Sequence, residues 1–250
     1  MGAVLKLNRS ILVALLAAST FKSLSMYGRA PKSNRHAISH APLMNAHRTN
    51  SVPRPTAVIL AGGAGVRFGG ADKGLLPLQG KPLIERMLIQ LEPQAAELFI
   101  SANRNLDRYA RYGHPVIRDH GSGFDGPMAG ISAGLNSART EWVLFVPVDS
   151  VQLPPDFAQR MCAAALQNGS STAVVHDGTS IVPVACLIHK RLSGDLDSTF
   201  AGGQRSVRHW LLKHQATEVH FDNHPRAYWS ANTPEELRAL EQKLEDHELL

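Results

Sequence analysis

The part of the sequence best suited to chemistry is a glycine-rich stretch with two cations. It reads Leu60-Ala61-Gly62-Gly63-Ala64-Gly65-Val66-Arg67-Phe68-Gly69-Gly70-Ala71-Asp72-Lys73. Glycines let backbone N–H groups turn inward and approach phosphate oxygens closely. Arg67 can bind two such oxygens at once, and Lys73 would act as a point charge. The glycines alone could form a simple tight turn, but the two cations favour a loop that binds a nucleoside triphosphate.

This stretch matches neither of the two common glycine-rich phosphate motifs. A Walker A loop ends in Gly-Lys-Ser or Gly-Lys-Thr, whereas Lys73 is followed by Gly74 and Leu75. The ordered GxGxxG set of dinucleotide-binding folds is also absent from it. We therefore expect a triphosphate loop of another kind.

Two aspartates close apolar runs further along the chain. Asp149 follows the run 142–146, and Asp119 follows Val116 and Ile117. Proteins usually hold Mg²⁺ with one or two carboxylates together with the phosphates of the substrate. A carboxylate at a strand end, in a chain with a phosphate loop, predicts a Mg²⁺ ligand at Asp149. Taken alone, either residue could equally be a helix N-cap or an ordinary loop aspartate.

A third candidate is the segment Gly126-Pro127-Met128-Ala129-Gly130. Its two glycines flank a predicted helix start, where a base or a ribose could lie against the backbone. An ordinary turn from loop to helix is the plainer interpretation.

Apolar runs alternate with helical patterns from Thr56 onward, and these elements must position the candidate residues. Strands are predicted at 57–60, 98–100, 116–117, 142–146, 173–175 and 182–188. Five helices are predicted: from Pro82, from Met128, after Pro154–Pro155, over 207–212 and from Thr233. In the third, Phe157, Met161 and Leu166 are expected to point inward, and in the last, Leu237, Leu240 and Leu244. This alternation predicts an α/β fold with a mostly parallel sheet and helices on both faces. Ligands of such sheets bind at the carboxyl ends of the strands.

Residues 1–55 differ in composition from the rest of the chain. They hold eight of the 26 Lys and Arg and none of the 21 Asp and Glu, so residues 56–250 carry a net charge of about −3. The apolar run 11–18 behind Lys6 and Arg9 resembles a targeting signal, and it is too short to span a bilayer. An over-long start or a disordered arm is the other interpretation. We expect one domain over 56–250, with no binding of nucleic acid or membrane.

Other kinds of site find little support in the sequence. Cys162 and Cys186 are far apart and lack the spacing of a zinc site, so we expect two small apolar residues in or near a core. The 12 histidines are scattered, and no Ser/His/Asp or Cys/His set is evident. Arg205 and Arg208, at a predicted helix start, could contact an acceptor phosphate or could simply be solvated.

Taken together, these motifs resemble those of the MobA-type molybdenum cofactor guanylyltransferases. The resemblance covers about residues 56–245. It rests on Leu60-Ala61-Gly62-Gly63, Arg67, Gly69-Gly70, Asp72-Lys73-Gly74, Gly80-Lys81-Pro82-Leu83, Asn103-Arg104, Gly126-Pro127-Met128-Ala129-Gly130, Pro147-Val148-Asp149, Val175-His176-Asp177-Gly178 and Asn232-Thr233-Pro234-Glu235-Glu236-Leu237. Leu-Ala-Gly-Gly with a downstream lysine is shared by many nucleotidyltransferases, whereas the ordered set is much more specific.

The resemblance implies a three-layer Rossmann-like nucleotidyltransferase fold and a reaction. GTP would donate GMP to molybdopterin, with Mg²⁺ as cofactor, giving molybdopterin guanine dinucleotide and pyrophosphate. It implies nucleotide binding by Leu60, Ala61, Gly62, Gly63, Lys73, Ser101, Asp119, Gly126 and Gly130, catalysis by Lys73, Arg67 and Asp149, Mg²⁺ at Asp149, and Asn232 near the pterin. Family members often have Asn where this chain has Ser101, so a contact there would pass through water. Cofactor-insertion proteins and molybdoenzyme chaperones would be transient partners, in the cytoplasm.

Two other functions remain open at this stage. One is transfer of another nucleotide, as CMP to molybdopterin or NMP to a sugar or polyol phosphate, and the segment 126–130 favours GMP over these. The other is a non-catalytic protein that binds the cofactor and delivers it to molybdoenzymes. The presence of both Lys73 and Asp149 argues against delivery alone, because binding by itself needs no metal carboxylate.

Overall fold

A computed structural model describes residues 52–63, 65–119, 126–221 and 231–248 of the 250-residue chain. The basic head predicted over 1–55 lies outside these residues except for its last four. Those four belong with the body in the structure, because Pro55 is buried and accepts a backbone hydrogen bond of 2.9 Å from Ala96. No helix in the described part of the chain is both long and apolar enough to cross a membrane.

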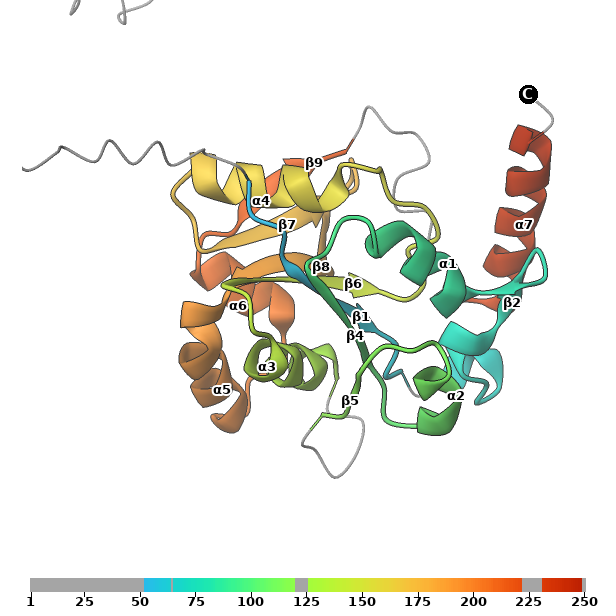
Figure 1. Cartoon of the computed structure of the whole chain (residues 1–250), viewed down its shortest axis with the longest axis horizontal. Helices are drawn as coiled ribbons and strands as arrows, with labels where there is room; N and C mark the ends of the chain where they lie inside the picture. The colour runs from blue at the N-terminus through green and yellow to red at the C-terminus, as the bar shows by residue number, and fades with distance from the viewer. Residues whose placement is uncertain (1–51, 64, 120–125, 222–230, 249–250) are drawn as a thin grey trace, which may run out of the picture. The chain divides into compact units, whose positions relative to one another are not determined.

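A seven-stranded sheet forms the centre of the body (Figure 1). Its strand order is β5-β4-β1-β6-β8-β7-β9. The bounds are β1 (Thr56–Leu60), β4 (Glu97–Ser101), β5 (Val116–Ile117), β6 (Trp142–Pro147), β7 (Thr172–His176), β8 (Ile181–His189) and β9 (Thr217–His220). Only β8 among these strands runs antiparallel to its neighbours, so the mostly parallel sheet predicted from the sequence is confirmed.

Helices cover both faces of this sheet and complete three layers (Figure 1). One face carries α1 (Leu83–Leu91) and α4 (Phe157–Gln167). The other carries α3 (Pro127–Ser137), α5 (Ser193–Ala201) and α6 (Val207–Lys213). The predicted three-layer fold is therefore confirmed.

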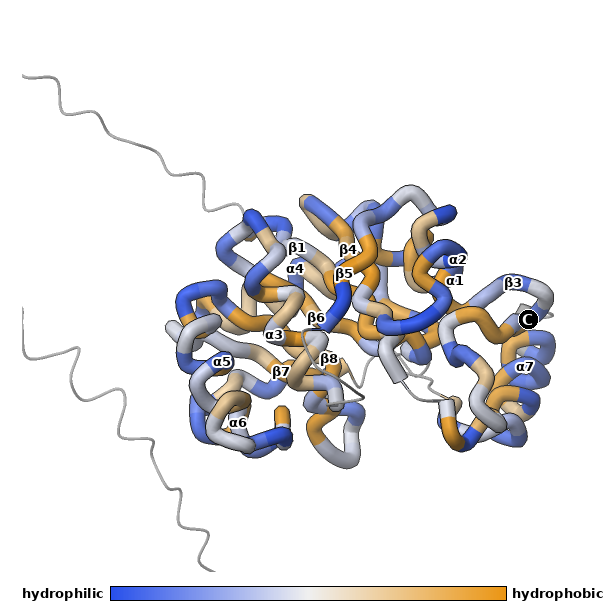
Figure 2. Tube along the Cα trace, turned by 90° about the horizontal axis from the view of Figure 1, so that it is seen from below, coloured by the Kyte–Doolittle hydropathy of each residue, from blue (hydrophilic) through white to orange (hydrophobic). Residues whose placement is uncertain are grey.

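The central strands are apolar along their whole length because both of their faces are covered. In β1, Ala57 and Ile59 belong to the core under α1 and α4, whereas Val58 belongs to the core under α3 and α6. All three are fully buried. Figure 2 shows the apolar colouring of these strands against the polar outer faces of the helices.

Helix α7 (Pro234–Glu248) packs beside a short hairpin formed by β2 (Pro77–Leu78) and β3 (Lys81–Pro82). Leu240 is buried in the same core as Leu78, and Glu241 accepts a hydrogen bond of 2.6 Å from the backbone N–H of Gln79. Thr233 caps the helix as predicted, since its hydroxyl accepts a hydrogen bond of 3.2 Å from the backbone of Glu236. The C-terminal helix therefore supports the segment that follows Lys73.

One predicted packing position is wrong, and several elements were not predicted. Leu166 of α4 is 49% exposed, whereas Ala165 is fully buried. The buried positions Phe157, Met161 and Ala165 are spaced by four residues, and Leu166 lies about 100° further round the helix. The unpredicted elements are the β2–β3 hairpin, α2 (Leu106–Ala110), α5 and β9. These are short or weakly amphipathic, so they leave little periodicity in the sequence.

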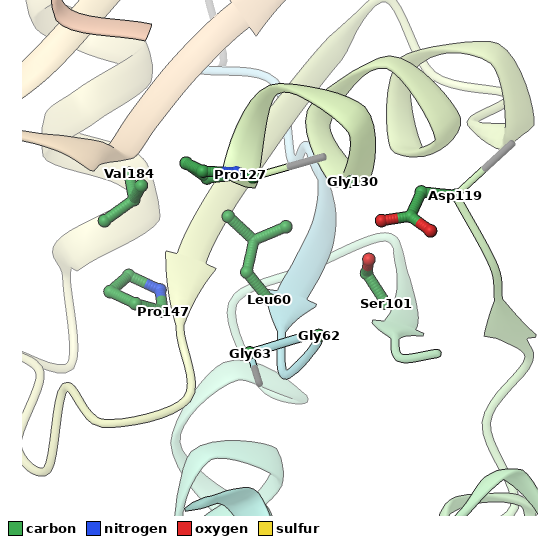
Figure 3. A pocket seen from close by; sticks show the side chains of 10 residues that line it. Leu60, Gly62, Gly63, Ser101, Asp119, Pro127, Gly130, Pro147 and Val184 are labelled. Carbon is green, nitrogen blue, oxygen red and sulfur yellow. The ribbon is translucent and has the colours of Figure 1, made fainter. Parts of the chain in front are cut away.

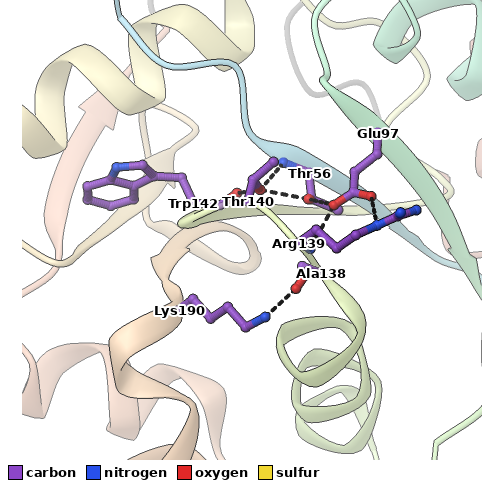
Figure 4. A network of polar contacts seen from close by, with 7 residues as sticks. All are labelled: Thr56, Glu97, Ala138, Arg139, Thr140, Trp142 and Lys190. Carbon is purple, nitrogen blue, oxygen red and sulfur yellow. Dashed lines mark hydrogen bonds and ion pairs between the residues drawn. The ribbon is translucent and has the colours of Figure 1, made fainter.

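A polar network ties three strands together at the amino-terminal edge of the sheet, opposite the predicted ligand edge (Figure 4). Glu97 of β4 accepts hydrogen bonds from the hydroxyl of Thr56 at 2.7 Å and from the backbone and guanidinium of Arg139 at 2.8 and 3.2 Å. Burial alone would raise the pKa of Glu97, but the hydrogen bonds from Arg139 and Thr56 outweigh it and lower that pKa. The ionised form of Glu97 therefore stabilises the fold.

We expect Glu97→Gln to lower the free energy of unfolding by roughly 1 kcal/mol at pH 7, because it removes a charged hydrogen-bond acceptor that solvent partly screens. The folded pKa lies below the ordinary value of 4.5, so the contribution is complete above that pH. It should disappear as the pH falls through the folded pKa. Urea unfolding of both proteins between pH 3 and pH 7 measures the difference, with the exposed Glu245→Gln as control. A difference that does not shrink in acid would contradict this account.

A glycine in α3 allows that helix to lie close to the sheet. A Cβ atom on Gly134 would lie 2.6 Å from Cε1 of Phe145 and 3.1 Å from Cγ2 of Val58. We expect Gly134→Ala to lower the free energy of unfolding by about 1–2 kcal/mol, because the steric cost exceeds the gain in helix propensity. Gly194→Ala in α5 is the matched control, since its Cβ would meet no atom within 4 Å. The control should be neutral or slightly stabilising in thermal unfolding, and a stabilised Gly134→Ala would refute the close approach.

Candidate active site

A pocket of about 250 Å³ lies at the carboxyl-terminal edge of the sheet (Figure 3). Its lining comes from Leu60, Gly62, Gly63, Ser101, Asp119, Gly126, Pro127, Gly130, Pro147 and Val184. Most of these are residues that the sequence proposes for the nucleotide, and they come from five neighbouring strands and their following loops. The structure thus gathers segments up to 124 positions apart into one cavity.

The polar end of the pocket is formed by Ser101 and Asp119, at the ends of β4 and β5. The Asp119 carboxylate accepts a hydrogen bond of 2.7 Å from the side-chain amide of Asn103, and the backbone N–H of Asp119 donates to the same amide at 3.3 Å. Asn103 therefore fixes the orientation of this carboxylate. Asn103 was predicted only as part of a motif, although its place two residues after β4 is a signal for such a role.

Helix α3 starts directly over this end of the pocket. Gly126 precedes the helix with a φ of +81°, a conformation that side chains rarely adopt. A Cβ atom on Gly130 would lie 2.9 Å from the hydroxyl of Ser101 and 3.2 Å from Cδ2 of Leu60. The first turn of α3 can therefore approach the strand ends only because glycine occupies position 130.

The apolar end of the pocket is formed by Pro147 and Val184 (Figure 3). Val184 lies in a bulge of β8, because β7 pairs Val174 with Cys186 but Val175 with Val182. Pairing of β8 with β6 ends at Phe145 and Cys186, so the bulged residues have no register partner on either side. Bulges next to active sites commonly redirect a side chain. Val184 was missed, although Pro183 within an apolar run was a signal for an irregular strand.

Lys73, Asp149 and Asn232 meet beside the glycine-rich stretch. The Lys73 ammonium group donates to the Asp149 carboxylate and, at 3.0 Å, to the side-chain oxygen of Asn232. The Lys73 and Asp149 side chains are only 19% and 14% exposed. Asn232 is held in turn by Glu236, which accepts a hydrogen bond of 2.7 Å from its backbone N–H. Three residues proposed for the reaction are thus brought together from separate parts of the chain.

Ala61 and Arg67, two of the residues proposed for the site, lie outside both the pocket lining and the Lys73 cluster. Ala61 is buried, and its N–H donates to the carbonyl of Ser101 at 2.8 Å, so it extends the pairing of β1 with β4. Arg67 is exposed on a short 3₁₀ turn, Val66–Phe68. The catalytic role of Arg67 stays a prediction.

Arg205 and Arg208 also lie outside the pocket lining. Arg205 donates to the carbonyls of Phe200 and Gln204 and stacks on the Phe200 ring at 4.0 Å, so its side chain is engaged at the end of α5. Arg208 is exposed on α6. Contact of either residue with an acceptor phosphate stays a prediction.

The ligands available at this edge suit a divalent cation that is bound partly by the protein and partly by the phosphates of the substrate. Within the described residues there is no group of three or more His, Cys, Asp or Glu side chains that could hold a metal alone. Asp149 instead offers one carboxylate in a largely enclosed position next to a loop suited to phosphates. A cation that keeps several bonds to phosphate and water, as Mg²⁺ does, fits such a site.

The two cysteine thiols are poorly suited to covalent catalysis. Cys162 and Cys186 are free and buried in the two cores, and neither lines the pocket. Burial raises the pKa of the Cys162 thiol to about 12. A thiol with such a pKa is protonated at neutral pH and is a weak nucleophile.

Comparison with known proteins identifies the family of this chain. Residues 57–219 match the model of the MobA-like NTP transferase domain. The molybdenum cofactor guanylyltransferase of Shewanella loihica is 38% identical over 192 residues, which cover 77% of this chain and 98% of that protein.

Two solved structures share the fold at low identity. Molybdopterin-guanine dinucleotide biosynthesis protein A from Archaeoglobus fulgidus superposes with a TM-score of 0.65 at 20% identity, covering 76% of this chain and 99% of that one. A manganese complex of a Mycobacterium tuberculosis protein gives a TM-score of 0.54 at 15% identity, covering 76% and 99%. The chain belongs to the family of MobA-like nucleotidyltransferases that includes the molybdenum cofactor guanylyltransferases.

Proposed function

We propose that this protein transfers GMP from GTP to molybdopterin, which yields molybdopterin guanine dinucleotide and pyrophosphate. The observation that carries the proposal is the pairing of two features at one sheet edge. A pocket with a fixed carboxylate, Asp119, lies at one side, and the cluster of Lys73, Asp149 and Asn232 lies beside the glycine-rich stretch. The family relationship supplies the substrates.

The base fits the polar end of the pocket. Guanine presents an N1–H and a 2-amino group as neighbouring donors, and an ionised carboxylate only accepts hydrogen bonds. Asp119 therefore suits this edge of guanine, with Asn103 keeping the carboxylate in place. Cytosine would turn its N3 and O2 acceptors toward the same carboxylate, which disfavours CTP.

The reaction itself needs positioning rather than a covalent nucleophile. An oxygen of the terminal phosphate of molybdopterin attacks the α-phosphorus of GTP in line, and the bond between the α-phosphorus and its bridging oxygen breaks as pyrophosphate leaves. Backbone N–H groups near Gly62 and Gly63 would hold the phosphates, and Lys73 would neutralise charge that develops on them. Asn232, in contact with Lys73, would lie on the acceptor side.

We assign the metal to Asp149 and propose Mg²⁺ as the physiological ion. A protein of the same fold from Mycobacterium tuberculosis has been solved as a manganese complex, which supports use of a divalent cation. When bound, the ion would neutralise phosphate charge and polarise the α-phosphate. Asp149 would hold it at the end of β6, within reach of the glycine-rich stretch.

The other candidate functions are less well supported. A different nucleotide or a sugar-phosphate acceptor would keep the mechanism, but Asp119 favours guanine. A non-catalytic delivery protein would not need a lysine and a carboxylate in contact beside a phosphate loop. Transient contacts with cofactor-insertion proteins and molybdoenzyme chaperones, and a location in the cytoplasm, remain part of the proposal because the substrates and the recipients would be there.

We expect the purified full-length protein, with Mg²⁺ and molybdopterin, to release pyrophosphate from GTP at least about 100-fold faster than from CTP or ATP, because a mismatched base leaves buried polar groups unpaired. A coupled pyrophosphate assay with the three nucleotides measures this. Preference for CTP would refute the role of Asp119 in base selection. No release from any nucleotide would favour the delivery function.

We expect Asp149→Asn and Lys73→Met each to lower kcat by about 100-fold or more, since each removes a charge placed against the transferring phosphate. Thermal unfolding should show that both variants fold. Asp156→Asn, at an exposed aspartate seven residues beyond Asp149, is the matched control and should keep its activity. Full activity in Asp149→Asn would overturn the metal assignment.

A further inference from the structure

Asp72 lies directly before Lys73, at an N-cap position, but its side chain does not cap the turn that follows. Asp72 precedes a 3₁₀ turn, Lys73–Leu75, and an aspartate at such a place normally caps the turn by accepting a backbone N–H. Its carboxylate makes no such bond here. It turns inward instead and is only 4% exposed. A buried carboxylate must be compensated by donors, so its partners reveal its function.

The partners of Asp72 all come from the segment that follows β4. The hydroxyl of Tyr109 donates to one carboxylate oxygen at 2.6 Å, and the amide of Asn105 donates to the other at 2.8 Å. The guanidinium of Arg104 lies 3.7 Å from the same carboxylate. These contacts join the glycine-rich stretch to the segment after β4, whereas a capping bond would have stayed within the stretch. Burial and the nearby Asp72 carboxylate raise the pKa of Tyr109, so this tyrosine stays a donor.

Arg104 extends the anchor to the two residues before Asp72. It donates to the carbonyls of Gly70 and Ala71 at 2.7 and 2.8 Å. Gly74, just after Lys73, lies so close to Tyr109 that a Cβ atom there would be 2.4 Å from the tyrosine oxygen. The backbone is therefore held on both sides of Lys73.

Asn105 shows that this arrangement is maintained at a conformational cost. It adopts a φ of +51°, which is unfavourable for residues other than glycine, although asparagine tolerates it best. This backbone turn lies in the segment that supplies both hydrogen-bond donors to Asp72 and its ion-pair partner Arg104. Strained residues of this kind persist where the surrounding contacts define them and often lie at functional sites.

We propose that Asp72 is a positioning residue for Lys73. Its buried carboxylate, bound by Tyr109 and Asn105, fixes the backbone from which the lysine side chain reaches Asp149 and Asn232. The effect of this anchor on the reaction rests on the proposed function, because Lys73 matters there only if it neutralises phosphate. A preorganised cation needs no rearrangement as the transition state forms. Loss of the anchor should then slow the chemical step more than it weakens binding of the nucleotide.

The first test is Tyr109→Phe, which removes one hydrogen bond to Asp72 and keeps the ring. We expect kcat for pyrophosphate release to fall about tenfold, with KM for GTP within about twofold, because a bond to a charged group is lost. Tyr112→Phe is the matched control, since Tyr112 lies in the same segment and makes no hydrogen bond through its hydroxyl to another described residue. It should behave as the unchanged protein. Asp72→Asn, a more severe change, should lower kcat further.

A double-mutant cycle separates positioning from general stability. If Asp72 acts through Lys73, adding Tyr109→Phe to Lys73→Met should cause no further loss of kcat. If the anchor supports only the fold, the two losses should multiply. Unchanged kcat in Tyr109→Phe, or multiplied losses, would overturn the proposal.

A chemical measurement makes the test independent of the enzymatic reaction. Acetylation of Lys73 by acetic anhydride, followed by peptide mass spectrometry, reports how firmly its ammonium group is held. We expect this rate to rise at least about threefold in Tyr109→Phe and to stay unchanged in Tyr112→Phe, because a looser backbone frees the lysine from Asp149. Equal rates would refute the positioning role. Faster acetylation in a protein that releases no pyrophosphate from GTP would support the positioning role and refute only the proposed function.

Discussion

The site depends on the parallel pairing of β1 with both β4 and β6. Leu60 is in register with Ser101 on one side and with Pro147 on the other. Because the three strands run in the same direction, their carboxyl ends lie at one level of the sheet. The glycine-rich stretch, the polar pocket and the Asp149 loop all start from that level. A shift in register would separate them, and burial of both faces of β1 opposes such a shift.

The regular sheet brings these residues to one edge, and two local features shape the walls of the pocket there. Gly130 lets α3 start against Leu60 and Ser101, and the bulge at Val184 ends the pairing of β8 with β6. Gly130 lets the start of α3 lie close enough to the strand ends to form one wall of the pocket, and the bulge leaves β8 residues without register partners beside it. At the opposite edge, Glu97 and its partners tie three strands together.

The sequence predicted the layers, the sheet direction and most pocket-lining residues, but it predicted few of the contacts that orient them. Continuous apolar runs mark β1 and β6, and glycines or carboxylates after such runs mark a ligand edge. The link from Asn103 to Asp119 spans 16 residues, and that from Asp72 to Tyr109 spans 37. No local pattern specifies such partners, because they depend on which strands become neighbours. Pro183 indicated an irregular strand, but the place of Val184 in the pocket could not be predicted, because a bulge is defined by its pairing with neighbouring strands.

The glycine-rich stretch has an open part and an anchored part, separated by only a few residues. Its second half is anchored, because Gly70, Ala71 and Asp72 are bound by side chains from the segment after β4. Before Gly70 the stretch carries the turn Val66–Phe68 and glycines whose Cβ atoms would meet no atom within 4 Å, such as Gly63 and Gly69. A triphosphate needs backbone that can adapt to its oxygens and a cation that does not move as charge develops. The open glycines precede the anchored lysine in the chain, so the stretch meets both requirements, and the buried carboxylate of Asp72 lies directly before Lys73.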